Sequence, residues 1–302
     1  HGLWSALVRT SLYHLHRSEY HDLNWRPNLL IFGGPPAQRA YLLHMGASVV
    51  QERGITSYIE MLKGNVSELI SDRDKVQRNF SALAPRYPNV FFRADIVPDV
   101  YRGVVTIAQS YGIGNFQSNT VMLGWPNKRE RSASYFRMVE DLILLDNTLM
   151  LVKYDDAKGF GKHRHIHVWW GGLQANGGMM LLLAYLTISH HLWRQAKVTA
   201  LTVVDSEDAR DKAKTGLENI FKSARLDAEA KVILRESESI EAIISRESKN
   251  VDLAFLGLRL PHDAEDPADL FDHYEGLLKN LPTTVLVHSG NDFKAAPILF
   301  DV

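Results

Sequence analysis

Cysteine is absent from the 302 residues of the sequence. This absence excludes disulfide bridges, thiolate zinc sites and a cysteine nucleophile, and it is compatible with a reducing cytosol. An excess of one charge is missing too, because 34 Lys and Arg residues stand against 35 Asp and Glu residues. A balanced chain has no strong field to attract nucleic acid or an anionic membrane surface, so we expect no nucleic-acid partner.

Long hydrophobic segments are also lacking. The longest apolar run extends from Met179 to Ile188, about half of the roughly 20 residues that a transmembrane helix requires. We therefore expect no direct membrane insertion of this chain. The sequence starts at His1 without an initiator methionine or a signal-peptide pattern, which leads us to expect that the natural protein is longer.

Complete catalytic motifs do not occur. The sequence has no G-x-S-x-G pentapeptide for a serine nucleophile and no full G-x-G-x-x-G or Walker motif for a nucleotide. His163, His165 and His167 alternate and would share one face of a strand, but no nearby carboxylate accompanies them. We therefore expect no catalytic site and no metal site.

Alternating strand and helix patterns fill most of the chain. Its length exceeds the roughly 250 to 300 residues at which a single core stops growing, so two domains are expected. Repeated βα units with apolar strands predict an α/β fold of two tandem doubly wound lobes, each with a mostly parallel five-stranded sheet. The expected strands are 28–32, 57–62, 90–96, 120–123 and 147–152 in the first lobe, and 166–170, 198–204, 230–234, 251–256 and 284–287 in the second.

The expected domain boundaries follow from the same pattern. Apolar residues recur every three or four positions near the N-terminus, which predicts an amphipathic connecting helix within residues 1–24. The first lobe is expected at 25–160 and the second at 161–302, joined by the polar, glycine-containing stretch 154–163. The helix must pack against its own domain, an upstream module or a second subunit, and the pattern leaves these alternatives open.

The loops that follow strands are the expected ligand sites of doubly wound sheets. The loop at 33–36 is expected to be a plain turn, because its two prolines remove amide donors. Asp205 and Ser206 are expected to cap the next helix. The glycine-rich segment before the strand at 120–123 supplies the weak candidates for a nucleotide or anion loop, namely Gly112, Gly114 and Asn119.

Five sequence blocks are similar to those of one protein family. Residues 113–126 resemble the G-x-x-x-P-N-T-x-x-x-G segment of the cytoplasmic C-terminal region of cation-chloride cotransporters, with Ser118 in place of the proline. Residues 166–170, 177–186 and 193–198 resemble the family's I-D-V-W-W, G-G-L-x-L-L-L-x-Y-L and W-x-x-C-K-x-R blocks, and residues 24–27 its N-W-R-P block. His167 replaces the usual acid and Ala196 the usual cysteine.

The resemblance implies a regulatory and dimerising cytoplasmic domain. Its partners would be a second copy and its own transmembrane transporter domain, which moves chloride with sodium, potassium or both. The chain would then lie on the cytoplasmic side of the cell membrane, as part of an integral membrane protein without enzymatic activity. No cofactor is expected, although the lobes would be similar to the universal stress protein fold, some of whose members bind ATP. A nucleotide-binding sensor of that type and a free scaffold are the alternatives.

Four residues are the candidates for the expected dimer interface. Trp4 and Leu7 lie on the apolar stripe of the N-terminal helix, and Trp169 and Trp170 lie in the block at 166–170. Large aromatic and apolar side chains are enriched at subunit interfaces. Residues 168–170 and the apolar run 179–186 are otherwise expected to form hydrophobic core.

Overall fold

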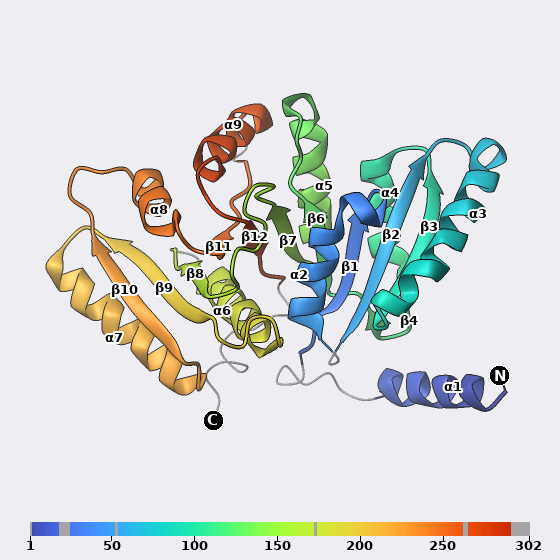
Figure 1. Ribbon diagram of the computed structural model, residues 1–302, viewed down its shortest axis with the longest axis horizontal. Coiled ribbons are helices and arrows are strands. Elements are labelled where there is room, and N and C mark those ends of the chain that lie inside the picture. Colours follow the sequence, from blue (N-terminus) through green and yellow to red (C-terminus); the bar gives the residue numbers. More distant parts are fainter. Residues whose placement is uncertain (1, 18–24, 52–53, 172–173, 262–264, 291–302) are drawn as a thin grey trace.

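A single sheet of ten strands forms the centre of the computed structural model, which describes residues 2–17, 25–51, 54–171, 174–261 and 265–290 (Figure 1). The ten strands of this sheet agree with the expected strands to within a few residues. The first half contains α1 (Gly2–Arg17), β1 (Asn28–Gly33), η2 (Pro36–Gln38), α2 (Ala40–Val50), β2 (Ile55–Lys63), α3 (Val66–Leu83), β3 (Val90–Val97), α4 (Val100–Ser110), β4 (Gly112–Ile113), β5 (Phe116–Gln117), β6 (Thr120–Gly124), α5 (Ser132–Leu144) and β7 (Thr148–Lys153).

The second half repeats this alternation. Ser206 accepts a hydrogen bond from the Ala209 backbone N–H at 3.3 Å and caps the helix that follows it, α7 (Glu207–Ser223), as expected. The elements are β8 (His165–Trp169), α6 (Gln174–Ser189), β9 (Lys197–Val204), α7 (Glu207–Ser223), β10 (Ala228–Leu234), α8 (Ile240–Ser248), β11 (Leu253–Gly257), α9 (Pro267–Leu278) and β12 (Thr284–His288).

The strand order confirms the doubly wound α/β fold. The order is β3-β2-β1-β6-β7 in the first half and β10-β9-β8-β11-β12 in the second. In each half, the first strands along the chain add to one side of the half's first strand and the later strands add to its other side, so the strand order reverses between β1 and β6 and between β8 and β11. Within each half, all strand pairs of the ten-stranded sheet are parallel, whereas β7 and β12 pair antiparallel and fuse the halves into one sheet. This fusion was not predicted from the sequence. Because of this antiparallel pairing, the strands of the two halves point in opposite directions, and their carboxyl ends lie on opposite sides of the shared sheet, measured along the strands.

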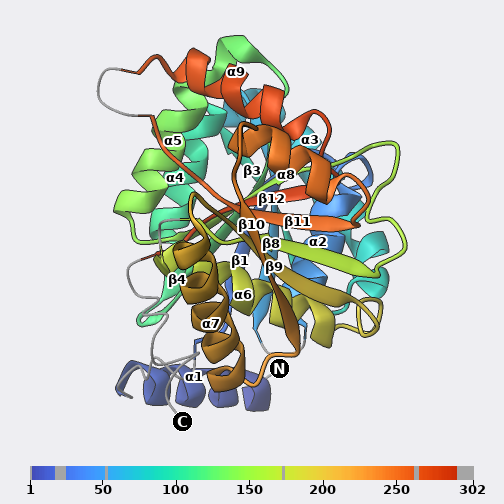
Figure 2. The same ribbon diagram turned by 90° about the vertical axis from the view of Figure 1, so that its left-hand side faces the viewer.

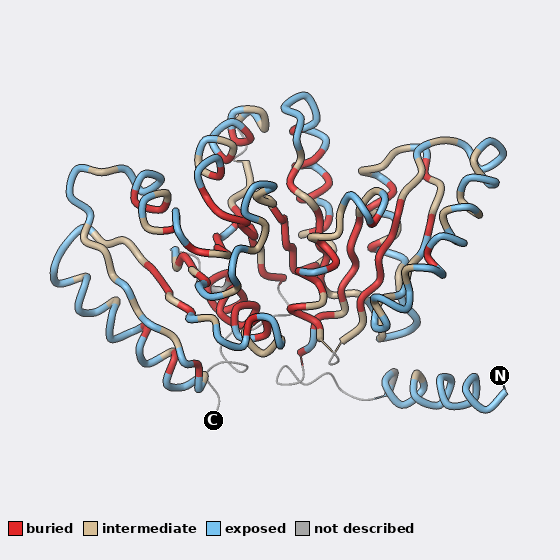
Figure 3. Tube along the Cα trace, viewed as in Figure 1, coloured by how far each residue is buried: buried red, intermediate tan, exposed pale blue. Residues whose placement is uncertain are grey.

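Two hydrophobic cores lie on the two faces of this sheet. Successive strand residues point to opposite faces, and Leu29 and Ile31 belong to one core while Leu30 and Phe32 belong to the other. Helices α2, α3, α6 and α7 cover the first face, and α4, α5, α8 and α9 cover the second. The buried positions follow the strands through both halves (Figure 3).

An aromatic cluster joins the halves on the second face. Trp125, which follows β6, stacks on Phe271 of α9 with ring centroids 5.8 Å apart and an interplanar angle of 3°. Its indole Nε1 donates a hydrogen bond of 2.6 Å to Glu275, and Tyr274 meets it edge-on. Helices α5 and α9 lie side by side (Figure 1). The contact ties the end of one half to a helix of the other.

Helix α1 lies apart from the sheet, below the rest of the molecule (Figure 2). It contacts β5 of the small β4–β5 hairpin, and apolar side chains along it are exposed, with Trp4 at 71% and Leu7 at 48%. Residues 18–24, which complete the expected connecting segment, lie outside the described residues. None of the described helices combines the length and hydrophobicity needed to cross a bilayer.

Candidate functional site

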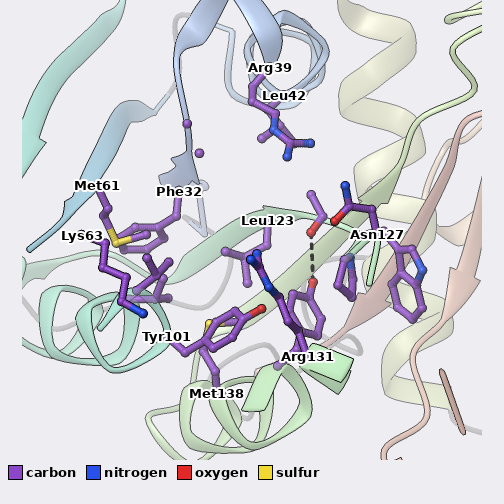
Figure 4. Close-up of a pocket in the computed structure, with 18 of the residues that line it drawn as sticks. Phe32, Arg39, Leu42, Met61, Lys63, Tyr101, Leu123, Asn127, Arg131 and Met138 are labelled. Atoms are coloured by element: carbon purple, nitrogen blue, oxygen red, sulfur yellow. Dashed lines mark hydrogen bonds between the residues drawn. The ribbon is translucent and has the colours of Figure 1, made fainter. Parts of the chain in front are cut away.

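A cavity of about 420 Å³ opens at the carboxyl ends of β1, β2 and β6. It lies where the strand order of the first half reverses, between β1 and β6. This is the position at which doubly wound sheets generally bind ligands. The cavity is closed by the residues that follow β1, by the N-terminal turn of α4 and by one face of α5. We take it as the candidate functional site (Figure 4).

Three cationic side chains reach this cavity from different elements. Arg39 precedes α2, Lys63 ends β2 and Arg131 precedes α5, and their charged groups approach the same space from separate sides (Figure 4). None of them forms an ion pair with another described residue. Asp99, the acidic residue of the wall, accepts a hydrogen bond of 3.0 Å from the Arg102 backbone N–H as the cap of α4. The cavity therefore carries a net positive charge and suits an anion.

Two tyrosines add neutral hydrogen-bonding groups. Burial raises the pKa of Tyr101 above its ordinary value, although Arg131 beside it acts in the opposite direction. Burial also raises the pKa of Tyr135 well above its ordinary value, and its hydroxyl donates a hydrogen bond of 3.2 Å to the Gly124 carbonyl. Both phenols therefore stay protonated at neutral pH. Tyr101 can act as a donor to a ligand at the cavity wall.

The turn after β1 has a conformation that depends on glycine. A Cβ atom on Gly33 would lie 2.3 Å from the hydroxyl of Tyr58, which is fully buried. That hydroxyl donates a hydrogen bond of 2.8 Å to the Gly34 carbonyl and so fixes the turn. The stretch is a turn, as expected from the sequence, and it also forms one wall of the cavity. Gly34 faces open space, since no atom lies within 4 Å of a Cβ built on it.

The three residues predicted for an anion loop lie elsewhere. Gly112 and Gly114 belong to the β4–β5 hairpin, which precedes β6 and therefore lies at the amino end of that strand. Asn119 uses its side chain to link segments, accepting from the Asn28 backbone N–H at 2.9 Å and donating to the Arg26 carbonyl at 2.8 Å. The structure does not bring these residues to the cavity, and the side chain of Asn119 already bridges neighbouring segments.

The four candidate interface residues divide into two pairs. Trp4 and Leu7 lie on the exposed face of α1. Trp169 is 6% exposed and donates a hydrogen bond of 2.9 Å from Nε1 to Ser248, and Trp170 is half-buried and packs across Gly177. Because α6 and α8 cover β8, Trp169 has almost no exposed surface for a partner. It belongs to the core, the alternative that the sequence left open.

The alternating histidines have different surroundings. The ring of His163 meets Trp193 edge-on, with centroids 4.5 Å apart, while His165 is exposed. The Nδ1 atom of His167 lies 3.1 Å from the hydroxyl of Ser248, and burial lowers the pKa of His167 to about 4. His163 therefore contributes to packing and His167 to hydrogen bonding. No group of three His, Asp or Glu side chains suited to a metal occurs in the described ranges.

Sequence reasoning missed the cationic residues of the cavity. The anion site was expected at a glycine-rich loop. The charges come instead from Lys63 at the last position of a strand and from Arg39 and Arg131 just before helices. Position alone could have indicated them, because residues at strand ends and helix starts gather at the carboxyl edge of a parallel sheet. Which of the chain's many basic residues meet there depends on the strand order.

Comparison with solved structures identifies similar folds. The chain resembles the cytoplasmic domain of a prokaryotic cation chloride cotransporter with a TM-score of 0.65 and 16% identity, over 89% of this chain and 97% of that one. A universal stress protein from Archaeoglobus fulgidus DSM 4304 gives 0.59 and 10% identity, over 90% and 100% of the two chains. A functionally unknown protein from Pseudomonas aeruginosa PAO1 gives 0.54 and 12% identity, over 91% and 96%. No protein-family profile matches the sequence. At these identities the likeness establishes the fold.

Proposed function

We propose that the chain is the regulatory and dimerising cytoplasmic domain of a membrane cation-chloride cotransporter. The observation that carries the proposal is the likeness in fold to the cytoplasmic domain of a prokaryotic member, which extends over nearly the whole of both chains. Two of the sequence blocks that resemble that family, residues 166–170 and 177–186, supply strand β8 and its covering helix α6 in this chain. In this proposal the chain lies on the cytoplasmic side and catalyses no reaction.

Helix α1 supports a role in assembly. Its exposed apolar side chains and Ile113 of the β4–β5 hairpin line a groove of about 650 Å³. Helices with an apolar stripe normally bury it against another element, and this stripe is left open within the described part of the chain. A second copy would cover the stripe, and α1 would then connect the dimer to the transporter.

Light scattering tests this assembly. The purified chain is expected to give twice its mass of 34.2 kDa at high concentration, and Leu7→Glu is expected to weaken the dimer at least about tenfold, because it places a charge in an apolar contact. Leu144→Glu is the matched control, since Leu144 is 83% exposed on another helix. A chain that stays monomeric at every concentration would overturn the dimer, and equal weakening by both variants would remove α1 from its interface.

The cationic cavity supports a second candidate function, that of a nucleotide-binding sensor. Phosphate groups bind where cationic side chains converge at the carboxyl edge of such a sheet. Arg39, Lys63 and Arg131 have that arrangement, and the wall contains apolar side chains of β1, β2 and β6 that could contact a base.

Calorimetric titration with ATP and ADP distinguishes the two candidates. If the sensor function is correct, ATP binds once per chain, and the double substitution Lys63→Met and Arg131→Met weakens it at least about tenfold through loss of charge-assisted contacts. Lys214→Met, on exposed α7, is the control and should leave binding unchanged. Absence of saturable heat with either nucleotide would eliminate the sensor. Release of phosphate from ATP would contradict the absence of enzymatic activity.

A further inference from the structure

A second cavity, of about 560 Å³, lies at the carboxyl ends of β8, β9 and β11. The strand order of the second half reverses between β8 and β11, just as that of the first half reverses between β1 and β6. The second cavity therefore occupies in its half the place that the cationic cavity occupies in the first. Its volume lies within the roughly 300–1,000 Å³ of small-molecule sites.

Aromatic carbon surfaces form much of its wall. Trp170 packs across Gly177 of α6, where a Cβ atom would come within 2.8 Å of the indole. The Nε1 atom of Trp169 donates a hydrogen bond to the hydroxyl of Ser248, and the hydroxyl of Tyr274 accepts a hydrogen bond of 2.7 Å from the Arg259 backbone N–H. Since the polar atoms of these two rings are engaged within the protein, the rings present mainly apolar surface to the cavity.

The charges of the second cavity differ from those of the first. Arg259 is the only Lys or Arg side chain among the described residues of its wall, and two hydrogen bonds of 2.6 and 2.9 Å join this guanidinium to Glu265. Glu241 adds a negative charge at the rim, next to His273. No Lys or Arg side chain is therefore left available in the described wall to bind a phosphate or carboxylate. The balance of charge disfavours an anionic ligand.

One buried amide supplies a specific polar contact. Asn176 is 5% exposed, and its Oδ1 accepts a hydrogen bond of 2.8 Å from the Ser289 backbone N–H. Its Nδ2 lies toward Gly257 at the cavity wall and has no hydrogen-bond acceptor within the described ranges. A ligand that enters the cavity with an acceptor group can take a hydrogen bond from this amide donor.

We propose that this second cavity binds an uncharged, flat aromatic molecule that stacks against Trp170 and accepts a hydrogen bond from Nδ2 of Asn176. The aromatic wall, the neutralised arginine and the free amide donor together select this ligand class over a nucleotide. The proposal concerns the second half of the chain alone and is independent of the transporter assignment.

Three probes of related shape test the ligand class on the full chain. Coumarin is flat and uncharged and carries a carbonyl acceptor, naphthalene lacks the acceptor, and coumarin-3-carboxylate adds a negative charge. Calorimetry or quenching of tryptophan fluorescence is expected to show saturable binding of one coumarin per chain. Naphthalene should bind roughly 2- to 10-fold more weakly because it leaves the donor unpaired, and the carboxylate should bind more weakly still. Failure of coumarin to saturate, or tighter binding of the carboxylate, would overturn the proposal.

Two glycine substitutions identify the site. A Cβ on Gly257 would meet only Asn176 atoms, at 3.7 and 3.9 Å, so Gly257→Leu should fill the second cavity without disturbing the fold. It is expected to weaken coumarin binding at least about tenfold. Gly34→Leu is the matched control, because it enters the cationic cavity instead and should leave coumarin binding unchanged. The reverse pattern would contradict the assignment, as would the absence of NMR contacts between coumarin and the Trp170 ring in the unmodified chain.

Discussion

Replacing Trp125 with alanine is expected to lower the free energy of unfolding by about 3–5 kcal/mol, the usual cost of removing a large buried aromatic side chain. Trp125 is 7% exposed and contacts α9 of the second half by stacking on Phe271 and by its hydrogen bond to Glu275. The substitution removes both interactions and leaves the Glu275 carboxylate without this donor. Equilibrium denaturation with urea measures the loss.

Two further variants separate the parts of this contact. Trp125→Phe keeps a ring for stacking but loses the indole donor, so it should cost distinctly less than the alanine substitution. Trp4→Ala removes the same kind of side chain where it is 71% exposed, and it should change the free energy of unfolding of the monomer by no more than about 0.5 kcal/mol. A similar loss for the Trp125→Ala and Trp4→Ala variants would contradict the importance of the cluster between the halves.

Replacing Leu286 with aspartate should destabilise both halves at once, by about 4 kcal/mol or more. Leu286 is fully buried on β12 and lies opposite Leu151 of β7, at the antiparallel junction of the shared sheet. An unpaired charge at this position has no compensating partner and also displaces packed side chains. Leu286→Met, which nearly conserves volume, should cost less than about 1.5 kcal/mol.

Hydrogen exchange reports where the Leu286→Asp variant opens. Because β7 and β12 are paired, we expect protection to fall in β6 and β7 as well as in β11 and β12. The Leu286→Met control should retain protection in all four strands. Loss of protection confined to the second half would indicate that the halves unfold separately, and it would contradict the description of one cooperative sheet.

Much of the fold could be predicted from the sequence because hydrophobic periodicity is local. The expected apolar strands 28–32 and 90–96 correspond closely to β1 and β3. The division into lobes at 25–160 and 161–302 stays a prediction. The two halves share one sheet, so the sheet itself does not mark a boundary between them. The pairing of β7 with β12 could not be foreseen, because both strands are apolar on both faces and their sequences carry no information about direction.

The candidate site was less predictable than the fold. Gly112 and Gly114 have backbone φ values of 141° and 60°, so glycine there is explained by the hairpin turn itself. The hairpin conformation thus accounts for these glycines, and an anion site at this loop stays a prediction. The cavity depends on Arg39, Lys63 and Arg131 meeting in space, although they are far apart in sequence. Only the order of the strands brings them together.

Ion uptake by the complete protein tests the central proposal most directly. The full reading frame that encodes this chain should be expressed, and uptake of labelled chloride should be measured with sodium and potassium present or replaced. We predict cation-dependent chloride uptake that falls when Leu7→Glu is introduced into α1 and is unchanged by Leu144→Glu. If the complete protein is present in the membrane but moves no chloride under any of these conditions, or if the reading frame encodes no membrane-spanning segments, the assignment to a cation-chloride cotransporter is contradicted.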